Sequence, residues 1–253
     1  MIESNNIQLR QPFNILLIGD DCVDVYKYGT VDRISPEAPV PVFKFSHDES
    51  RPGMAGNVLQ NLQALGASVT YLHSETSTKT RLIELRSKQQ IVRIDDDVLS
   101  VPIEVPNNLF VYDAIIVSDY VKGTVSYELV EKLRATYSGP IFVDTKKSDI
   151  ARFEGCFVKI NSLENSRITS KCSGLIVTQG ELGATLHDYN YPAPHVAVSD
   201  VTGAGDTFLS ALAYQYLVDF NIEAAIKYAI RASAITVQHI GVYAPTHEEI
   251  QCV

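Results

Sequence analysis

Six short runs of apolar residues along the chain alternate with longer segments of mixed polarity. Most of the runs end at a polar or small residue, as the buried strands of a parallel sheet do. The runs are NILLIG (14–19), SVTYL (68–72), AIIVS (114–118), IFVD (141–144), FVKIN (157–161) and LIVT (175–178). We expect them to form one mostly parallel sheet.

Segments of helix length lie between or after several of these strands. The predicted helices cover residues 55–65, 125–137, 204–220 and 223–240, and Gly241 is a candidate C-cap for the last of them. This alternation is typical of an α/β domain with helices layered on a sheet. Ligands of such sheets bind beyond the carboxyl ends of the strands. The residues at those ends are Asp119, Asp144, Asn161 and Thr178.

Residues 25–45 interrupt the alternation. Their sequence, VYKYGTVDRISPEAPVPVFKF, is rich in β-formers and prolines and contains no segment of helix length. Proline restricts such a segment to edge strands and loops. We therefore expect a small β-flap, or lid, that projects from a single domain spanning residues 1–253.

Composition narrows the class of ligand. The chain has 253 residues, of which 45% are hydrophobic, and its net charge of −9 disfavours nucleic acid or an anionic membrane as the main partner. The four cysteines have no CxxC spacing, which fits a reducing cytosol, and no export or anchoring signal is visible. We expect a cytoplasmic protein that binds a small polar ligand.

A glycine-rich turn, VTGAGD (201–206), stands directly before the helix predicted from residue 204. Glycines at a helix entrance let an anion approach the backbone N–H groups, so the turn predicts a phosphate site. Asp206 would repel that phosphate unless it accepts a proton, meets a metal or faces a second substrate.

Other interpretations of this turn explain less. No GxxxxGK[ST] string exists in the chain, and the dinucleotide pattern GxGxxG fails because Phe208 occupies its third glycine position. A turn that only begins a helix leaves Asp200 and Asp206 unexplained.

Two longer strings resemble the signatures of a known family. DVTGAGDTF (200–208) is similar to the C-terminal signature of the ribokinase-like (PfkB) sugar kinases, and RPGMAGNVLQNLQALGA (51–67) to their sugar-side signature. Further strings, among them GDDCVDVYKYGTVDRISPEAPVPVF and VTQGELGATL, closely resemble the branch that contains D-glycero-β-D-manno-heptose-7-phosphate kinase. The resemblance runs from about Asn14 to Thr246 and implies a ribokinase-like three-layer fold.

Two departures from that branch stand out. Met54 occupies a position where the branch commonly has glycine, and the segment between Leu72 and Thr78 is much shorter than usual. About one helix and one strand are missing there, outside the motifs. We expect a trimmed fold that keeps its activity.

The resemblance implies phosphoryl transfer from ATP to a sugar hydroxyl. Asp206 would be the catalytic base, and the backbone of Gly203, Ala204 and Gly205 would hold the charge on the transferred group. Asn161 and Glu164 resemble the family's N-x-x-E element, which organises Mg²⁺, often through water. A loop asparagine beside a surface glutamate is the alternative interpretation of this string.

The resemblance also implies binding residues. Asp24, Gly53 and Asn57 would contact the sugar, with Asp119 as a weaker candidate, because carboxylates and amides pair well with hydroxyl groups. Thr178 and Gly180 resemble ATP-contacting positions. Asp200 and Thr202 resemble residues that line a monovalent-cation (K⁺) site.

A substrate that already carries a phosphate would need a cationic clamp. Arg33 and Arg51 lie beside the sugar-side motifs, and a guanidinium can bind phosphate oxygens bidentately. The alternative is that both are solvated flap or loop arginines with no role in binding.

The sequence leaves open which function the resemblance carries. The expected reaction converts D-glycero-β-D-manno-heptose 7-phosphate to the 1,7-bisphosphate. Another sugar, or a non-catalytic relative that binds nucleotide or sugar, remains an alternative, although a purely binding protein has no need of Asp206 as a base. Because the lid exposes strand edges, we also expect a homodimer joined through it.

Overall fold

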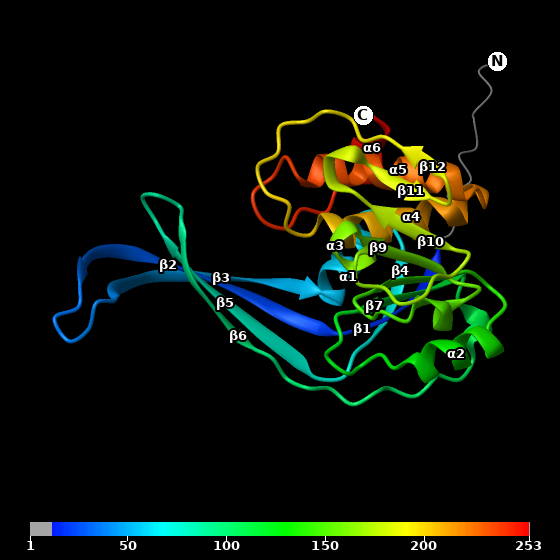
Figure 1. The fold of residues 1–253 in the computed structure, drawn as a ribbon, viewed down its shortest axis with the longest axis horizontal. Coiled ribbons are helices and arrows are strands. Elements are labelled where there is room, and N and C mark those ends of the chain that lie inside the picture. The colour runs from blue at the N-terminus through cyan, green and yellow to red at the C-terminus, as the bar shows by residue number, and fades with distance from the viewer. Residues whose placement is uncertain (1–11, 253) are drawn as a thin grey trace, which may run out of the picture.

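The structure, a computed structural model, describes residues 12–252 and contains a main sheet with a smaller sheet projecting from it (Figure 1). The main sheet has the strand order β12-β11-β10-β9-β8-β7-β1-β4. Its strands are parallel from β10 to β4, whereas β11 and β12 are antiparallel additions at one edge. The strands are β1 (Asn14–Gly19), β4 (Ser68–Leu72), β7 (Ala114–Asp119), β8 (Ile141–Thr145), β9 (Phe157–Asn161), β10 (Leu175–Thr178), β11 (Ala184–Leu186) and β12 (Tyr189–Tyr191).

All six strands predicted from apolar runs are confirmed. They lack polar alternation because successive side chains enter two different hydrophobic layers. On β1, for example, Leu17 packs into one layer and Leu16 into the other. The mostly parallel α/β sheet is therefore covered on both faces.

The helices complete three layers. One face carries α1 (Ala55–Ala64), α4 (Ala204–Asp219), α5 (Ile222–Thr236) and α6 (His247–Gln251), and the other is covered by α2 (Tyr127–Thr136) and short 3₁₀ segments (Figure 1). The short segments are η1 (Leu109–Val111) and η2 (Ile150–Phe153); α3 (Ser162–Asn165) and η3 (Gly180–Leu182) follow β9 and β10.

The expected helix at 223–240 is wrong at its C-terminal end. It ends at Thr236 with Val237 as its C-cap, so Gly241 does not cap it. Gly241 instead has a positive φ of 76° and donates its backbone N–H to Asp200 Oδ2 at 2.9 Å. The glycine therefore serves a loop that is tied to the turn before α4.

The lid is a four-stranded sheet in the order β3-β2-β5-β6. Its strands are β2 (Asp21–Ile34), β3 (Pro41–Met54), β5 (Thr76–Glu84) and β6 (Gln90–Asp96). The hairpin of β2 and β3 is longer than the stretch expected at 25–45, and β5 and β6 were not expected in the lid. Pro41 and Pro52 lie on β3, an edge strand that tolerates the missing N–H groups.

The shortened segment connects the two sheets directly. β4 ends at Leu72 and β5 begins at Thr76, so no helix or further strand of the main sheet intervenes. In the region that follows β6, residues 97–113, η1 is the only helical segment described. The fold is trimmed here, away from α4.

Met54 joins β3 to α1 in a strained conformation. Its φ of 49° and ψ of −129° suit glycine, and its side chain is nonetheless buried. The glycine that the related branch commonly has at this position would meet the backbone requirement without strain.

Candidate active site

The first turn of α4 places Asp206 at the base of a cavity of about 380 Å³. The helix begins after Gly203, whose φ of 80° lies in the left-handed region. A Cβ at Gly203 would lie 2.7 Å from Nδ2 of Asn57, so glycine is also required for space. The turn thus brings α4 against the first turn of α1.

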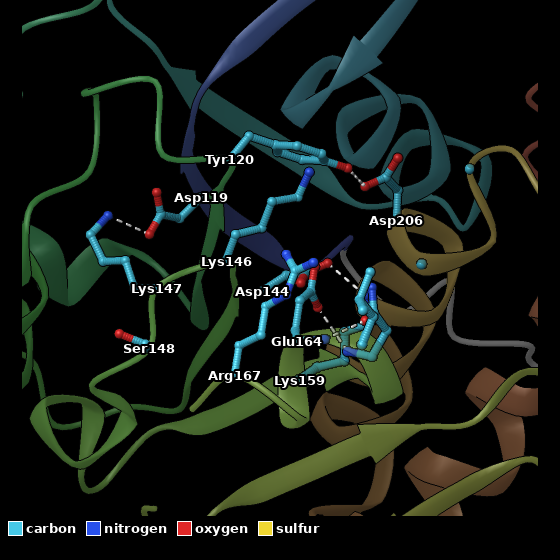
Figure 2. A pocket seen from close by; sticks show the side chains of 14 residues that line it. Asp119, Tyr120, Asp144, Lys146, Lys147, Ser148, Lys159, Glu164, Arg167 and Asp206 are labelled. Carbon is cyan, nitrogen blue, oxygen red and sulfur yellow. Dashed lines mark hydrogen bonds and ion pairs between the residues drawn. The ribbon is translucent and has the colours of Figure 1, made fainter. Parts of the chain in front are cut away.

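Two hydrogen bonds orient the Asp206 carboxylate. Asn57 Nδ2 donates to Oδ2 at 2.8 Å. The Tyr120 hydroxyl donates to Oδ1 at 2.9 Å (Figure 2). Burial raises the pKa of Asp206 to about 6, and the charge of Asp144 acts in the same direction. The hydrogen bonds from Asn57 and Tyr120 and the charge of Lys159 oppose that rise. Asp206 is therefore ionised near neutral pH but is a stronger base than an exposed aspartate.

Tyr120 was missed by the sequence reasoning, which stopped at Asp119. Asp119 itself is buried and accepts hydrogen bonds from Thr145 and Lys147, so its side chain braces the end of β7 although it lines the cavity. Asp20 accepts three backbone N–H bonds from Tyr120, Lys122 and Thr124. The loop that carries Tyr120 is therefore fixed by buried carboxylates.

Basic side chains line the other walls of the cavity (Figure 2). Lys146 lies over the Tyr120 ring, 4.1 Å from its centroid, and burial lowers the pKa of this lysine. Lys159 pairs with Asp144 at 2.7 Å. Arg167 and Lys147 also line the space. The cavity also contains the carboxylates of Asp119, Asp144, Glu164 and Asp206, and Lys147 and Lys159 are paired with the first two. Lys146 and Arg167 are therefore the cations best placed to attract an anionic ligand.

Asn161 and Glu164 form a capping box at α3. Glu164 N–H donates to Asn161 Oδ1 and Asn161 N–H to Glu164 Oε2, both at 2.8 Å. Both residues also line the cavity, together with the Asp144 carboxylate. The described residues contain no group of three His, Cys, Asp or Glu that could hold a metal. Mg²⁺ usually takes one or two carboxylates plus water and phosphate oxygens, so this sparse oxygen set fits a magnesium–nucleotide complex.

A second, apolar cavity of about 240 Å³ adjoins the first at Gly205. Thr178 and Gly180 line it, as does Ala204 of the glycine-rich turn. Apolar side chains supply most of the remaining wall, including Val196, Val198, Val201, Phe208, Ile230 and Val237. The two cavities therefore offer an apolar chamber and a charged chamber on either side of the N-terminus of α4.

The sugar-side residues on the lid form a separate cluster. Asp24 is buried on β2 and pairs with Arg81 of β5 at 2.5 Å. A Cβ at Gly53 would lie 2.6 Å from Asp24 Oδ2, so the glycine makes room for this carboxylate. Arg81 and Arg51 flank the Tyr26 ring, at 5.2 and 5.4 Å from its centroid. The sequence reasoning did not single out Arg81.

The two predicted clamp arginines are separated. The Arg51 guanidinium lies against the loop glycine Gly241, where a Cβ would overlap Nη1. Arg33 is exposed near the end of the β2–β3 hairpin, which extends far from α4 (Figure 1). Arg33 lines neither cavity. The role of Arg33 in a phosphate clamp therefore stays a prediction.

Asp200 is occupied by hydrogen bonds within the turn. Its Oδ1 accepts from the N–H and hydroxyl of Thr202, and its Oδ2 accepts from Gly241 N–H. Burial alone would raise the pKa of Asp200, but these bonds hold it below its usual value. The pair holds the 237–241 loop beside the turn, and its role toward K⁺ stays a prediction.

Sequence comparison supplies the family. Residues 161–249 match the pfkB family carbohydrate kinases. A D-beta-D-heptose 7-phosphate kinase from Bordetella bronchiseptica is 31% identical over an alignment that covers 93% of this chain and 94% of that protein. The chain belongs to the pfkB carbohydrate kinase family.

Longer relatives match the same region. The bifunctional protein HldE of Nitratiruptor sp. is 33% identical over 94% of this chain, and the chain spans 64% of that protein's length. The alignment extends over 298 positions, more than the 253 residues present here. This pfkB protein therefore lacks residues that the relative has, in agreement with the expected trimming.

Solved structures agree on the fold. A ribokinase from Thermotoga maritima superposes with a TM-score of 0.71 at 16% identity, covering 95% of this chain and 98% of that one. Phosphofructokinase-2 from Escherichia coli, solved in complex with potassium, gives 0.72 at 13% identity, covering 96% and 98%. At these identities the likeness shows a ribokinase-like fold.

Proposed function

We propose that the protein transfers the γ-phosphate of ATP to a hydroxyl group of D-glycero-β-D-manno-heptose 7-phosphate and so forms the 1,7-bisphosphate. The observation that carries the proposal is the buried Asp206 carboxylate, held by Asn57 and Tyr120 in the charged cavity, next to Gly205, where that cavity adjoins the apolar one. The named heptose 7-phosphate kinase relative supports the choice of sugar.

The two cavities suit the two ends of ATP. The apolar chamber beside Phe208 and Val237 fits a purine ring, and the charged chamber lined by Lys146 and Arg167 fits the phosphates. Gly205 borders both, so a nucleotide lying across it would bring its terminal phosphate to the first turn of α4. Backbone N–H groups and the helix dipole favour an anion at that turn.

Proton transfer follows from the geometry of Asp206. The carboxylate would accept the proton of the sugar hydroxyl as the hydroxyl oxygen attacks the γ-phosphorus. Asn57 and Tyr120 keep the carboxylate oriented, because each donates to a different oxygen. Asn161 and Glu164 would hold Mg²⁺ through water. When bound, the ion would neutralise part of the charge of the nucleotide phosphates.

In this proposal the lid and the first turn of α1 supply the sugar side. Asp24 and the amide of Asn57 would accept and donate hydrogen bonds to hydroxyl groups, and Arg51 would bind the phosphate that the sugar already carries. We also propose a cytoplasmic location, since the four cysteines are free. Among the described residues no helix is long and apolar enough to cross a membrane.

A coupled assay of ADP release tests the function. The protein is incubated with MgATP and a panel that contains heptose 7-phosphate, fructose 6-phosphate, ribose and fructose. We expect the highest kcat/KM with heptose 7-phosphate. Preference for a free sugar would overturn the heptose assignment and leave a sugar kinase, whereas ADP release from none of a broad panel would favour a non-catalytic relative.

A further inference from the structure

Lys159 is a buried cation in the middle of the main sheet. Its side chain is 5% exposed on β9, and burying an ammonium group is costly unless it is paired. Its partner is Asp144, the residue opposite it in the β8–β9 register. This pair alone would make Lys159 a structural residue.

The position of the ammonium group gives it access to the reacting atoms. Nζ packs directly on the glycine-rich turn, because a Cβ at Gly205 would lie 2.8 Å from it. Gly205 precedes the proposed base, Asp206, and both residues line the charged cavity together with Lys159 (Figure 2). The ammonium group thus lies at the edge of the space where the γ-phosphate would meet the sugar.

The Lys159 ammonium group has more N–H donors than acceptors around it. An ammonium group has three N–H donors, and among residues 12–252 only Asp144 accepts one from Nζ. Two of its donors therefore lack a protein acceptor among the described residues.

We propose that Lys159 is a further catalytic residue, whose ammonium group donates hydrogen bonds to the non-bridging oxygens of the phosphoryl group during transfer. The assignment rests on the proposed kinase function. In the step, the bond from the γ-phosphorus to the oxygen of ADP breaks and ADP keeps its electron pair. The sugar oxygen forms the new bond, its proton passes to Asp206, and Lys159 keeps its own proton throughout.

Charge makes Lys159 suited to this role. In phosphoryl transfer the negative charge spreads over the three equatorial oxygens of a loose transition state, so a fixed cation beside them lowers the barrier. An ammonium group is a compact point charge, and here the Asp144 pair holds it in place before the substrate arrives. Preorganisation of this kind acts on kcat more than on binding.

Chemical rescue tests the assignment. We expect Lys159→Ala to lower kcat by roughly 10²–10³-fold, with the Kd of ADP and the KM of the sugar little changed. Ethylammonium should enter the space left by the side chain and restore kcat at least about tenfold. Tetramethylammonium, which carries the same charge but no N–H donor, is the matched control and should restore none.

Stability needs its own control, because Lys159→Ala leaves Asp144 unpaired. The double variant Lys159→Met with Asp144→Asn replaces the ion pair with neutral groups of similar size, and thermal unfolding reports whether it folds. We expect it to fold and to remain as slow as the single variant.

Three results would overturn the assignment. A Lys159→Ala or double variant within about threefold of the parent kcat excludes a catalytic role. A loss that neither ammonium ion restores indicates a purely structural pair. A parent protein that is inactive on every sugar overturns the proposed function and this assignment together, whereas an active parent with an equally active variant overturns this assignment alone.

Discussion

At the scale of single residues, the chemistry depends on how Asp206 is held. Burial raises the pKa of this carboxyl to about 6, and the hydrogen bonds from Asn57 and Tyr120 keep it from rising further. If Asp206 is the base, as we propose, it must be ionised to accept a proton, so we expect activity to fall as the pH falls through its pKa.

The pH profile is the first prediction. We expect kcat/KM to rise about tenfold per pH unit below pH 6 and to level off above it. Tyr120→Phe removes a hydrogen bond to the charged form, so the pKa rises and the acid limb moves up by roughly 1–2 pH units. Tyr189→Phe, at an exposed position on β12, is the control and should leave the profile unchanged. Identical profiles for Tyr120→Phe and the parent would show that Asp206 does not set the acid limb.

Sequence reasoning reached part of this site. The glycine-rich turn and Asp206 were predictable because a helix entrance with glycines has a local physical meaning. Asn57 depended on the family resemblance, and Tyr120, Lys159 and Arg81 were missed. Their contacts cross from one strand or loop to another, and no local pattern in the sequence marks a side chain whose partner lies many residues away.

At the scale of elements, the junction of β3 with α1 stores strain at Met54. A residue with a side chain at φ 49° and ψ −129° costs about 1–3 kcal/mol. The same side chain is buried, so truncating it also loses packing.

Stability measurements on paired variants separate these effects. Met54→Ala and Met54→Gly lose the same packing, but only glycine relieves the strain. We therefore expect the glycine variant to have a free energy of unfolding roughly 1 kcal/mol higher than the alanine variant. At an ordinary position alanine would be the more stable of the two by about 0.5–1 kcal/mol. If denaturant unfolding shows the alanine variant to be the more stable of the two, Met54 is not strained.

The lid strands carry the specificity prediction. Arg51→Ala should raise KM for heptose 7-phosphate about ten- to a hundredfold, because a charge-assisted contact of roughly 1.5–3 kcal/mol is lost. Activity on an unphosphorylated sugar should barely change. Arg51 pairs with Glu49 at 3.3 Å, so the matched control is Arg93→Ala, which breaks the Arg93–Asp95 ion pair on β6. An unchanged KM in Arg51→Ala would remove Arg51 from the substrate site.

Hydrophobic patterning predicted the six parallel strands of the main sheet, most of which are buried on both faces, but not its antiparallel edge strands β11 and β12. It failed for β5 and β6, whose residues are largely exposed or half-buried and mix charged with apolar side chains. β5 is defined by pairing with β2, and β6 by pairing with β5, and the local sequence reveals neither contact.

At the scale of the whole molecule, the lid is the surface that best suits association with a second copy of the chain. It projects from the main domain as a sheet with β3 and β6 as its edges (Figure 1). Several large apolar side chains on it are exposed, including Phe45 at 54% and Ile94 at 55%. Free edges and exposed apolar groups favour association.

We predict a homodimer joined through the lid. For the parent, light scattering at micromolar concentration should give twice the mass of one chain. The double variant Phe45→Glu with Ile94→Glu should give the mass of a single chain. Phe110→Glu changes an even more exposed aromatic residue in η1, outside the lid, and should remain dimeric. A parent protein that is a stable monomer at this concentration would contradict the predicted dimer.

The central claim is that Asp206 removes the proton of a sugar hydroxyl during phosphoryl transfer from ATP. Its most direct test is the kcat of ADP release with heptose 7-phosphate for Asp206→Asn beside the parent, with the Kd of ATP measured in parallel. Asparagine keeps the shape and can still hydrogen-bond but cannot accept the proton. We predict that kcat falls by roughly 10²–10⁴-fold while the Kd of ATP stays close to that of the parent. A variant that releases ADP as fast as the parent would contradict the account.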